Sequence, residues 1–206
     1  MTAPRVKICG LRRRSDVQSA VQAGADALGF VFTPRSKRFL EAGDAAGLVD
    51  TVPAFVARVG LFMDQEAEEV RAVLDRVALS LLQFHGNESG AFCRQFGRPY
   101  IKAVSMAQGA SADDWQREYP DAAALLLDSH EPGGAGGTGQ TFDWRTIPAM
   151  SHALVLAGGL SPANVARAVA QVRPWAVDVS SGVEDAPGIK NEQKMITFIQ
   201  EAKRES

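Results

Sequence analysis

Several features that would assign a protein to a membrane, an export route or a disulfide-bonded class are missing from this sequence. No apolar run reaches the ~18 residues that a membrane-spanning helix needs, and the N-terminal stretch MTAPRVKICG lacks the apolar core of a signal peptide. The 206 residues include only two cysteines, Cys9 and Cys93, which we expect to be free thiols. The sequence therefore predicts a cytoplasmic protein with no membrane partner.

Metal and nucleotide motifs are missing as well. The sequence contains no HExxH, CxxC or P-loop pattern, so it predicts no metal site and no cofactor. Its 22 basic and 24 acidic residues give a net charge of −2, with both signs scattered along the chain. The longest basic run, Arg12 to Arg14, is too short to indicate nucleic-acid binding. We expect a small-molecule partner instead.

What the sequence does contain is a regular alternation of short apolar runs and helical patterns. Strands are expected at residues 5–9, 27–32, 55–62, 79–85, 100–105, 123–128, 153–157 and 176–180. Helices are expected at residues 15–23, 66–76, 161–171 and 192–204, with weaker ones at 41–50, 89–96 and 112–119 and a short one after 142. Ser15 and Ser161 are the predicted N-caps, and Pro162 follows the second.

Two architectures fit eight strands that alternate with helices: an open doubly wound sheet and a closed (β/α)8 TIM barrel. The barrel is favoured because several strands have one apolar and one polar face, as where Lys7 and Cys9 alternate with Val6 and Ile8. We therefore predict one compact barrel over residues 1–206, with short helices around the fifth and sixth units. A glycine-rich linker between two domains is the alternative, which the continuing βα alternation disfavours.

The chemistry of such a barrel lies where its strands end. The ends carry Cys9-Gly10, Gln83-Phe84-His85-Gly86, Asp128, Gly158-Gly159 and Ser180-Ser181-Gly182. The last two sets follow the seventh and eighth strands, where small barrels commonly bind phosphate through backbone N–H groups. We predict that Gly158, Gly159, Ser180, Ser181 and Gly182 bind phosphate, although each turn alone would suit any tight βα connection.

The chain carries, in order, the motifs VKICG, GFVFTPRSKRF, VGLF, QFHG, LLLDS…GGTGQTFDW, LAGGLSPANV and DVSSGVEDAPGIK. This series, from Lys7 to about Lys194, resembles the phosphoribosylanthranilate isomerase family of tryptophan biosynthesis. Two departures are GLRRR after Cys9-Gly10, where many relatives have a threonine and a single arginine, and QFHG where QLHG is commoner. Neither departure affects the residues that the resemblance makes catalytic.

The resemblance implies an Amadori rearrangement of N-(5-phosphoribosyl)anthranilate to an aminoketose, 1-(2-carboxyphenylamino)-1-deoxy-D-ribulose 5-phosphate. It implies Cys9 as the general base and Asp128 as the general acid, with no cofactor. A thiol titrates near ~8.5, closer to neutrality than a carboxyl, and Lys7 on the same face would favour its thiolate. Asp128 must hold its proton, which a desolvated position at the end of an apolar strand favours.

The substrate-binding residues that we predict are Lys7, Arg38, Gln83, His85, Gly137 and Asp178. The family's pattern around TPRSKRF selects Arg38 as the clamp for the anthranilate carboxylate, and leaves Arg35 and Lys37 as solvated charges. The glycine-rich residues 133–139 are expected to cover the bound substrate, or alternatively to form a disordered surface loop.

Other interpretations stay open. From the residues alone, Cys9 is as compatible with core packing as with catalysis, and Asp128 with an ordinary turn; Cys93 indicates core packing. The histidine-pathway barrel performs the same rearrangement on another substrate, but it resembles this chain less because it has aspartate where Cys9 stands. A phosphate-ligand sensor and a thiol-redox protein are further alternatives, and the sequence does not distinguish a monomer from a homodimer.

Overall fold

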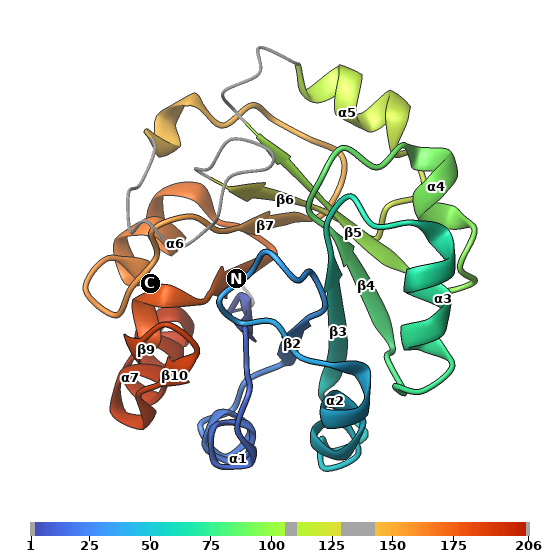
Figure 1. Ribbon diagram of the computed structural model, residues 1–206. Coiled ribbons are helices and arrows are strands. Elements are labelled where there is room, and N and C mark those ends of the chain that lie inside the picture. The colour runs from blue at the N-terminus through green and yellow to red at the C-terminus, as the bar shows by residue number, and fades with distance from the viewer. Residues whose placement is uncertain (1–2, 106–110, 129–142, 205–206) are drawn as a thin grey trace.

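The computed structural model describes residues 3–105, 111–128 and 143–204. Its strands β1 to β8 are parallel and pair in sequence order until β8 meets β1, which closes the barrel (Figure 1). They are β1 (Arg5–Cys9), β2 (Ala27–Val31), β3 (Ala57–Phe62), β4 (Leu81–Phe84), β5 (Tyr100–Ser105), β6 (Ala124–Asp128), β7 (Leu154–Leu156) and β8 (Ala176–Val179). The predicted closed barrel is confirmed, and the open sheet is wrong.

Helices surround this barrel on the outside (Figure 1). They are α1 (Arg14–Gln22), α2 (Ala42–Val49), α3 (Ala67–Leu74), α4 (Gly90–Arg94), α5 (Ala112–Glu118), α6 (Val165–Val172) and α7 (Glu192–Lys203), with 3-10 turns η2 (Trp144–Thr146) and η3 (Ser181–Val183). The helices of the fifth and sixth units are short, as predicted: α5 has seven residues and η2 three. Among the described residues, no helix is long and apolar enough to cross a membrane.

The two predicted N-caps are wrong. Helix α1 begins at Arg14 with Arg13 as its N-cap, so Ser15 lies inside the first turn. Helix α6 begins at Val165 rather than near Ser161. The Asn164 side chain accepts a hydrogen bond from the Ser161 N–H at 2.8 Å and donates one to the Gly159 carbonyl at 2.9 Å. These side-chain bonds stabilise a polar turn where the Ser-Pro pattern predicted helix.

One element was not predicted from the sequence. Between β8 and α7 the chain forms an antiparallel hairpin of two short strands, β9 (Glu184–Ala186) and β10 (Ile189–Lys190). Gly188 in its turn has a φ of +80°, which glycine adopts without steric cost. The hairpin lies beside α7 (Figure 1), and its Lys190 side chain reaches back to Ser180 at the end of β8.

The alternation of side chains along the strands divides the core into two regions. Val6, Ile8 and Leu125 belong to a large cluster that packs the outside of the barrel against the helices. A smaller cluster fills the interior and consists of Ile101, Ala103, Ala124, Leu126, Val155, Ala157 and Ala176. Polar residues such as Lys7 and Gln83 are also buried on the interior faces of the strands. The barrel interior therefore contains both an apolar cluster and buried polar side chains, as expected for a barrel whose site lies at the carboxyl ends of its strands.

Candidate active site

Strand β1 presents Lys7 and Cys9 to the barrel interior, where both side chains are buried. Cys9 pairs with Gly29 of β2 in the parallel ladder. A Cβ atom at residue 29 would lie only 2.7 Å from the Cys9 sulfur, so any larger residue there would collide with the thiol. The glycine in GFVF thus makes room for Cys9, a role that the sequence did not reveal.

Lys7 and Asp178 form an ion pair across the ladder between β1 and β8. The Lys7 Nζ is 2.9 Å from the Asp178 Oδ1, and the two side chains are 4% and 10% exposed. Burial lowers the pKa of Lys7, but the neighbouring Asp178 and Cys9 raise it by more, so the lysine stays charged. Two predicted substrate-binding residues are therefore paired with each other directly below the thiol.

Lys7 favours the Cys9 thiolate, as expected, but its effect on the pKa of Cys9 is smaller than that of burial. Burial raises the pKa of the Cys9 thiol, and the Lys7 ammonium opposes this change without reversing it. Asp178 raises the pKa further, whereas Lys190 lowers it. The net direction is upward because the site is desolvated and the negative Asp178 offsets much of the lysine charge. The resting site therefore holds Cys9 as a thiol.

Asp128 lies at the carboxyl end of β6 and contacts His85, which follows β4. The His85 Nε2 is 3.5 Å from the Asp128 Oδ2, and both side chains are largely buried. The His85 Nδ1 is 3.1 Å from the Gln83 side-chain nitrogen. With the amide in this orientation Nδ1 accepts, so Nε2 carries the hydrogen and directs it toward Asp128. Three predicted site residues thus form one connected chain.

The turns after β7 and β8 meet at the barrel mouth. Gly158 and Gly159 have φ values of +79° and +65°, a conformation that side chains other than glycine rarely adopt. Within the described part of the chain, no group accepts a hydrogen bond from their N–H groups. Gly182 packs so closely on the carbonyl of Leu160 that a Cβ atom would not fit. The predicted phosphate-binding glycines of both turns therefore lie together.

Arg38 lies over the end of β1 and is held by the unpredicted hairpin. Its Nε donates to the Glu184 Oε1 at 3.1 Å and its Nη2 to the Glu184 Oε2 at 2.7 Å. A Cβ atom at Gly10 would be 3.0 Å from the Arg38 Cγ, which places this arginine next to the residue that follows Cys9. A bidentate ion pair thus fixes the orientation of the guanidinium, and the base of the same side chain lies beside Gly10.

Lys190 completes this network from the second strand of the hairpin. Its Nζ is 2.7 Å from the Glu184 Oε1 and donates to the Ser180 carbonyl at 3.0 Å. Burial lowers the pKa of Lys190, and Glu184 opposes that shift. Sequence analysis missed Glu184 and Lys190, although both lie within DVSSGVEDAPGIK. Their spacing of six residues brings them into contact only because the hairpin folds back.

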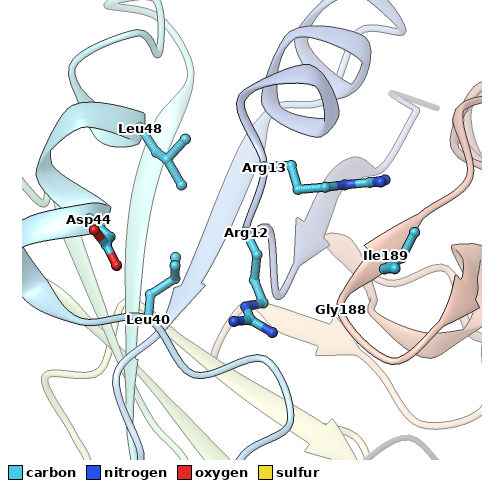
Figure 2. A pocket seen from close by; sticks show the side chains of 7 residues that line it. All are labelled: Arg12, Arg13, Leu40, Asp44, Leu48, Gly188 and Ile189. Atoms are coloured by element: carbon cyan, nitrogen blue, oxygen red, sulfur yellow. The ribbon is translucent and has the colours of Figure 1, made fainter.

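The arginines after Cys9-Gly10 lie beside the mouth, not in it. Arg13 donates to Asp16 at 2.6 and 2.9 Å and to the Lys190 carbonyl at 3.0 Å, so it ties α1 to the hairpin. Arg12 faces a separate surface pocket (Figure 2). That pocket is lined by Arg12, Arg13, Leu40, Asp44, Leu48, Gly188 and Ile189. None of these residues belongs to the predicted site.

Three further predictions concern the glycine-rich segment, metal ligands and Cys93. Gly137 and the whole glycine-rich segment 133–139 lie outside the described residues. Among the residues that are described, no three His, Cys, Asp or Glu side chains gather as metal ligands would. Cys93 is fully buried on the inner face of α4, as expected for core packing.

Comparison with known proteins gives one family. Residues 6–201 match the family model described as N-(5'phosphoribosyl)anthranilate (PRA) isomerase. A curated relative, N-(5'-phosphoribosyl)anthranilate isomerase of Thiobacillus denitrificans, is 52% identical over 202 residues, which cover 98% of each chain.

Solved structures agree with the sequence match. The phosphoribosyl anthranilate isomerase of Thermotoga maritima is similar with a TM-score of 0.86 at 42% identity, covering 97% of this chain and 98% of that one. A phosphoribosyl anthranilate isomerase in complex with reduced 1-(o-carboxyphenylamino)-1-deoxyribulose 5-phosphate has a TM-score of 0.80 at 39% identity, with the same coverage.

Proposed function

Because the chain belongs to the N-(5'-phosphoribosyl)anthranilate isomerase family, we propose that it isomerises this substrate, in tryptophan biosynthesis, with Cys9 as general base and Asp128 as general acid. The observation that carries the proposal is the convergence of a buried thiol and a carboxyl at the ends of β1 and β6, beside two glycine turns. Acid and base are the two groups that an aldose–ketose rearrangement needs.

The proposed steps are proton transfers between the substrate and these two groups. Asp128 donates its proton to the ring oxygen of the ribose, and the ring opens to a Schiff base between C1 and the anthranilate nitrogen. Cys9 reacts in its thiolate form, which arises when the buried thiol loses its proton to solvent before the reaction. The thiolate removes the proton from C2, and the electron pair of that C–H bond forms the enolamine. In the tautomerisation to the aminoketose, C1 takes up the proton held by Cys9 and the C2 hydroxyl returns a proton to Asp128, which restores both groups.

His85 and Gln83 serve this chemistry by orienting the acid. The imidazole Nε2 lies 3.5 Å from the Asp128 Oδ2, and Gln83 contacts the opposite ring nitrogen at 3.1 Å. A side chain held from both sides keeps a fixed orientation and a fixed tautomer. We therefore assign His85 to positioning Asp128 in addition to the substrate contact expected from sequence.

The phosphate of the substrate is proposed to bind where the turns after β7 and β8 meet. The N–H groups of Gly158 and Gly159 donate to no acceptor among the described residues, and backbone N–H groups are good ligands for an anion. The 5-phosphate carries most of the substrate's charge, so this contact is expected to supply much of the binding energy. A member of the family is solved with a phosphate-bearing ligand.

Gly159→Val is expected to weaken the binding of substrate, product and inorganic phosphate together, by roughly tenfold or more. A β-branched residue cannot adopt the φ of +65° without strain, so the turn must move. The Michaelis constant and the dissociation constants of product and phosphate measure the effect. Gly24→Val is the control, because Gly24 has a φ of +91° but lies in the turn between α1 and β2, away from the site. Unchanged affinity for all three ligands in Gly159→Val would contradict the phosphate site.

The carboxylate of the anthranilate ring is proposed to bind Arg38. The base of this side chain lies beside Gly10, and Glu184 holds its planar guanidinium in a fixed orientation. A guanidinium binds a carboxylate through two parallel hydrogen bonds, which an ammonium cannot do. Arg35 and Lys37 are exposed, as expected for solvated charges.

Arg38→Lys is therefore expected to lower kcat/KM by roughly ten- to a hundredfold, because two charge-assisted hydrogen bonds are lost. Lys37→Ala, at an exposed position on the same segment, should change kcat/KM less than threefold. A substrate analogue without the ring carboxylate shows whether the loss comes from carboxylate binding or from another effect of the substitution. The loss in Arg38→Lys should shrink with that analogue, whereas an equal loss with both substrates would place Arg38 outside the recognition site.

The proposed chemistry as a whole is tested by turnover of freshly prepared phosphoribosylanthranilate, followed by the loss of its fluorescence. The wild-type chain should consume the substrate without added metal or cofactor. Variants of Cys9 and Asp128 should fail in the same assay while they still bind product. A chain that turns over substrate equally well without either group would exclude this acid–base assignment but not the family's reaction.

A further inference from the structure

A buried ion pair lies outside the barrel, in the layer between strands and helices. Lys102 is on β5, where its neighbours Ile101 and Ala103 face the interior and Lys102 itself, 2% exposed, faces the helices. Its Nζ is 3.4 Å from the Oε2 of Glu88, a 7% exposed residue in the segment between β4 and α4. Neither residue was identified from the sequence, and neither takes part in the proposed proton transfers.

This ion pair forms hydrogen bonds with both the carbonyl and the N–H group of one residue, Gly86. The Lys102 Nζ donates to the Gly86 carbonyl at 2.6 Å, and the Gly86 N–H donates to the Glu88 Oε2 at 2.9 Å. Gly86 directly follows His85, whose own N–H donates to the Phe62 carbonyl at 2.9 Å. The backbone on both sides of the His85 side chain is thereby held in place.

Neighbouring segments also form hydrogen bonds with the turn that contains Gly86 and Glu88. The Glu88 Oε1 accepts from the Asp64 N–H at 2.9 Å, and the Asp64 Oδ1 accepts from the Asn87 N–H at 2.6 Å. At the end of α5, the Tyr119 hydroxyl donates to the Glu88 carbonyl at 3.0 Å, and its ring centroid lies 5.6 Å from the Lys102 Nζ. Residues after β3, β4 and α5 therefore converge on the short segment that carries His85.

Stability alone does not account for such a pair. Removing two charges from water costs several kcal/mol per ion, and apolar residues of similar volume often replace a buried pair without loss of stability. What apolar residues would not supply is a donor and an acceptor for the Gly86 peptide group. The pair therefore matters most for the geometry of the turn, and the side chain on that turn contacts Asp128.

We propose that Lys102 and Glu88 are positioning residues for the isomerisation: they clamp Gly86 so that the His85 imidazole stays against Asp128. This inference rests on the proposed roles of His85 and Asp128. It predicts that the pair affects the chemical step more than substrate binding, because Lys102 faces the helices and not the barrel interior.

The test is the double variant Lys102→Met/Glu88→Gln, which removes the pair and leaves no unpaired buried charge. We expect a thermal midpoint close to that of the wild type, a kcat lowered by roughly ten- to a hundredfold and a KM changed less than threefold, because small misplacements of a catalytic group are costly. Arg94→Met is the matched control. It removes an exposed ion pair with Asp121 in the same layer, without touching Gly86, and should leave kcat unchanged.

A double-mutant cycle distinguishes positioning from a general structural role. His85→Ala should lower kcat by itself, and adding Lys102→Met/Glu88→Gln to His85→Ala should cause almost no further loss, because the pair acts through the missing imidazole. If the double variant does not fold, Lys102→Gln/Glu88→Gln takes its place in the cycle, since it also leaves no unpaired buried charge and replaces the ammonium that binds the Gly86 carbonyl with a shorter amide.

Three outcomes would overturn the inference. The first is a wild-type kcat in the folded pair variant, and the second is a full additional loss in the His85→Ala background. The third is a wild-type kcat in His85→Ala itself, which would also withdraw the role of His85 in the proposed function. A lowered kcat in His85→Ala with an unaffected pair variant would leave the proposed function intact and remove only the clamp.

Discussion

Cys9→Ala is expected to lower kcat by about 10²–10⁴-fold, because a positioned general base contributes on that order to a proton transfer. Product affinity should stay close to that of the wild type, since the proposed phosphate and carboxylate anchors lie elsewhere. The fluorescence assay measures kcat, and calorimetric titration with product measures affinity. A kcat within a few-fold of the wild type would remove Cys9 from the mechanism.

Two further cysteine variants sharpen this experiment. Cys9→Ser keeps a side chain of similar shape but should be nearly as inactive, because a hydroxyl is a far weaker base than a thiol near neutrality. Cys93→Ala is the matched control: it removes the other buried cysteine, which lies on the inner face of α4, and should leave kcat unchanged. Loss of activity in both Cys9→Ala and Cys93→Ala would indicate a packing defect instead.

The pH dependence of kcat follows from the protonation of Cys9. A base acts only when it is deprotonated, so kcat rises with pH through the pKa of the base. Burial raises the pKa of the Cys9 thiol, so the rising limb of the wild type should extend to alkaline pH. Cys9→Asp should retain some activity with its rising limb at lower pH, because carboxyls ionise at lower pH than thiols. Identical limbs in the two enzymes would mean that another group is the base.

Asp128→Asn is expected to lower kcat by a similar factor of about 10²–10⁴, because an amide cannot donate an acidic proton to the ring oxygen. The side chain keeps its size, so the contact with His85 and the end of β6 should persist. Substrate affinity should change much less than kcat. Single-turnover measurements separate the two effects, since they report the chemical step independently of product release.

The control for this variant is Asp143→Asn. Asp143 is the next described aspartate after Asp128 and is an exposed N-cap residue paired with Arg145. Its loss should reduce local stability slightly and leave kcat unchanged. If Asp143→Asn were as inactive as Asp128→Asn, or Asp128→Asn retained wild-type kcat, the acid would have to be sought among other groups at the barrel mouth.

The secondary structure and the barrel could be predicted because their signals are local. Strand β1 was predicted with its observed bounds, Arg5–Cys9, and the other strands within two residues at each end, since apolar alternation directly reflects which face is buried. The start of α6 was mispredicted near Ser161 because Asn164, three residues later, competes for the same backbone groups through its side chain. A local sequence pattern does not show whether Ser161 or Asn164 precedes the first turn of the helix.

Only some residues of the candidate site could be predicted from the sequence. The strand-end residues Cys9 and Asp128 were found because the ends of parallel strands meet at one side of a barrel, whatever the loops do. Gly29, Glu184 and Lys190 were missed because their roles depend on distances between separate segments: a glycine beside a thiol, and a hairpin that folds over Arg38. The net direction of the Cys9 pKa could not be predicted, because burial, which sequence does not measure, outweighs the nearby lysine.

By itself, then, the sequence determined the order of strands and helices, the closed barrel and the family, since periodicity and motifs are properties of neighbouring residues. Only the tertiary structure decided how charges far apart in the chain pair with one another. Lys7 meets Asp178 because β1 and β8 close the barrel, and Lys102 meets Glu88 because β4 and β5 lie side by side. Electrostatic energy depends on separation in space and on burial, and both are set only when the chain has folded.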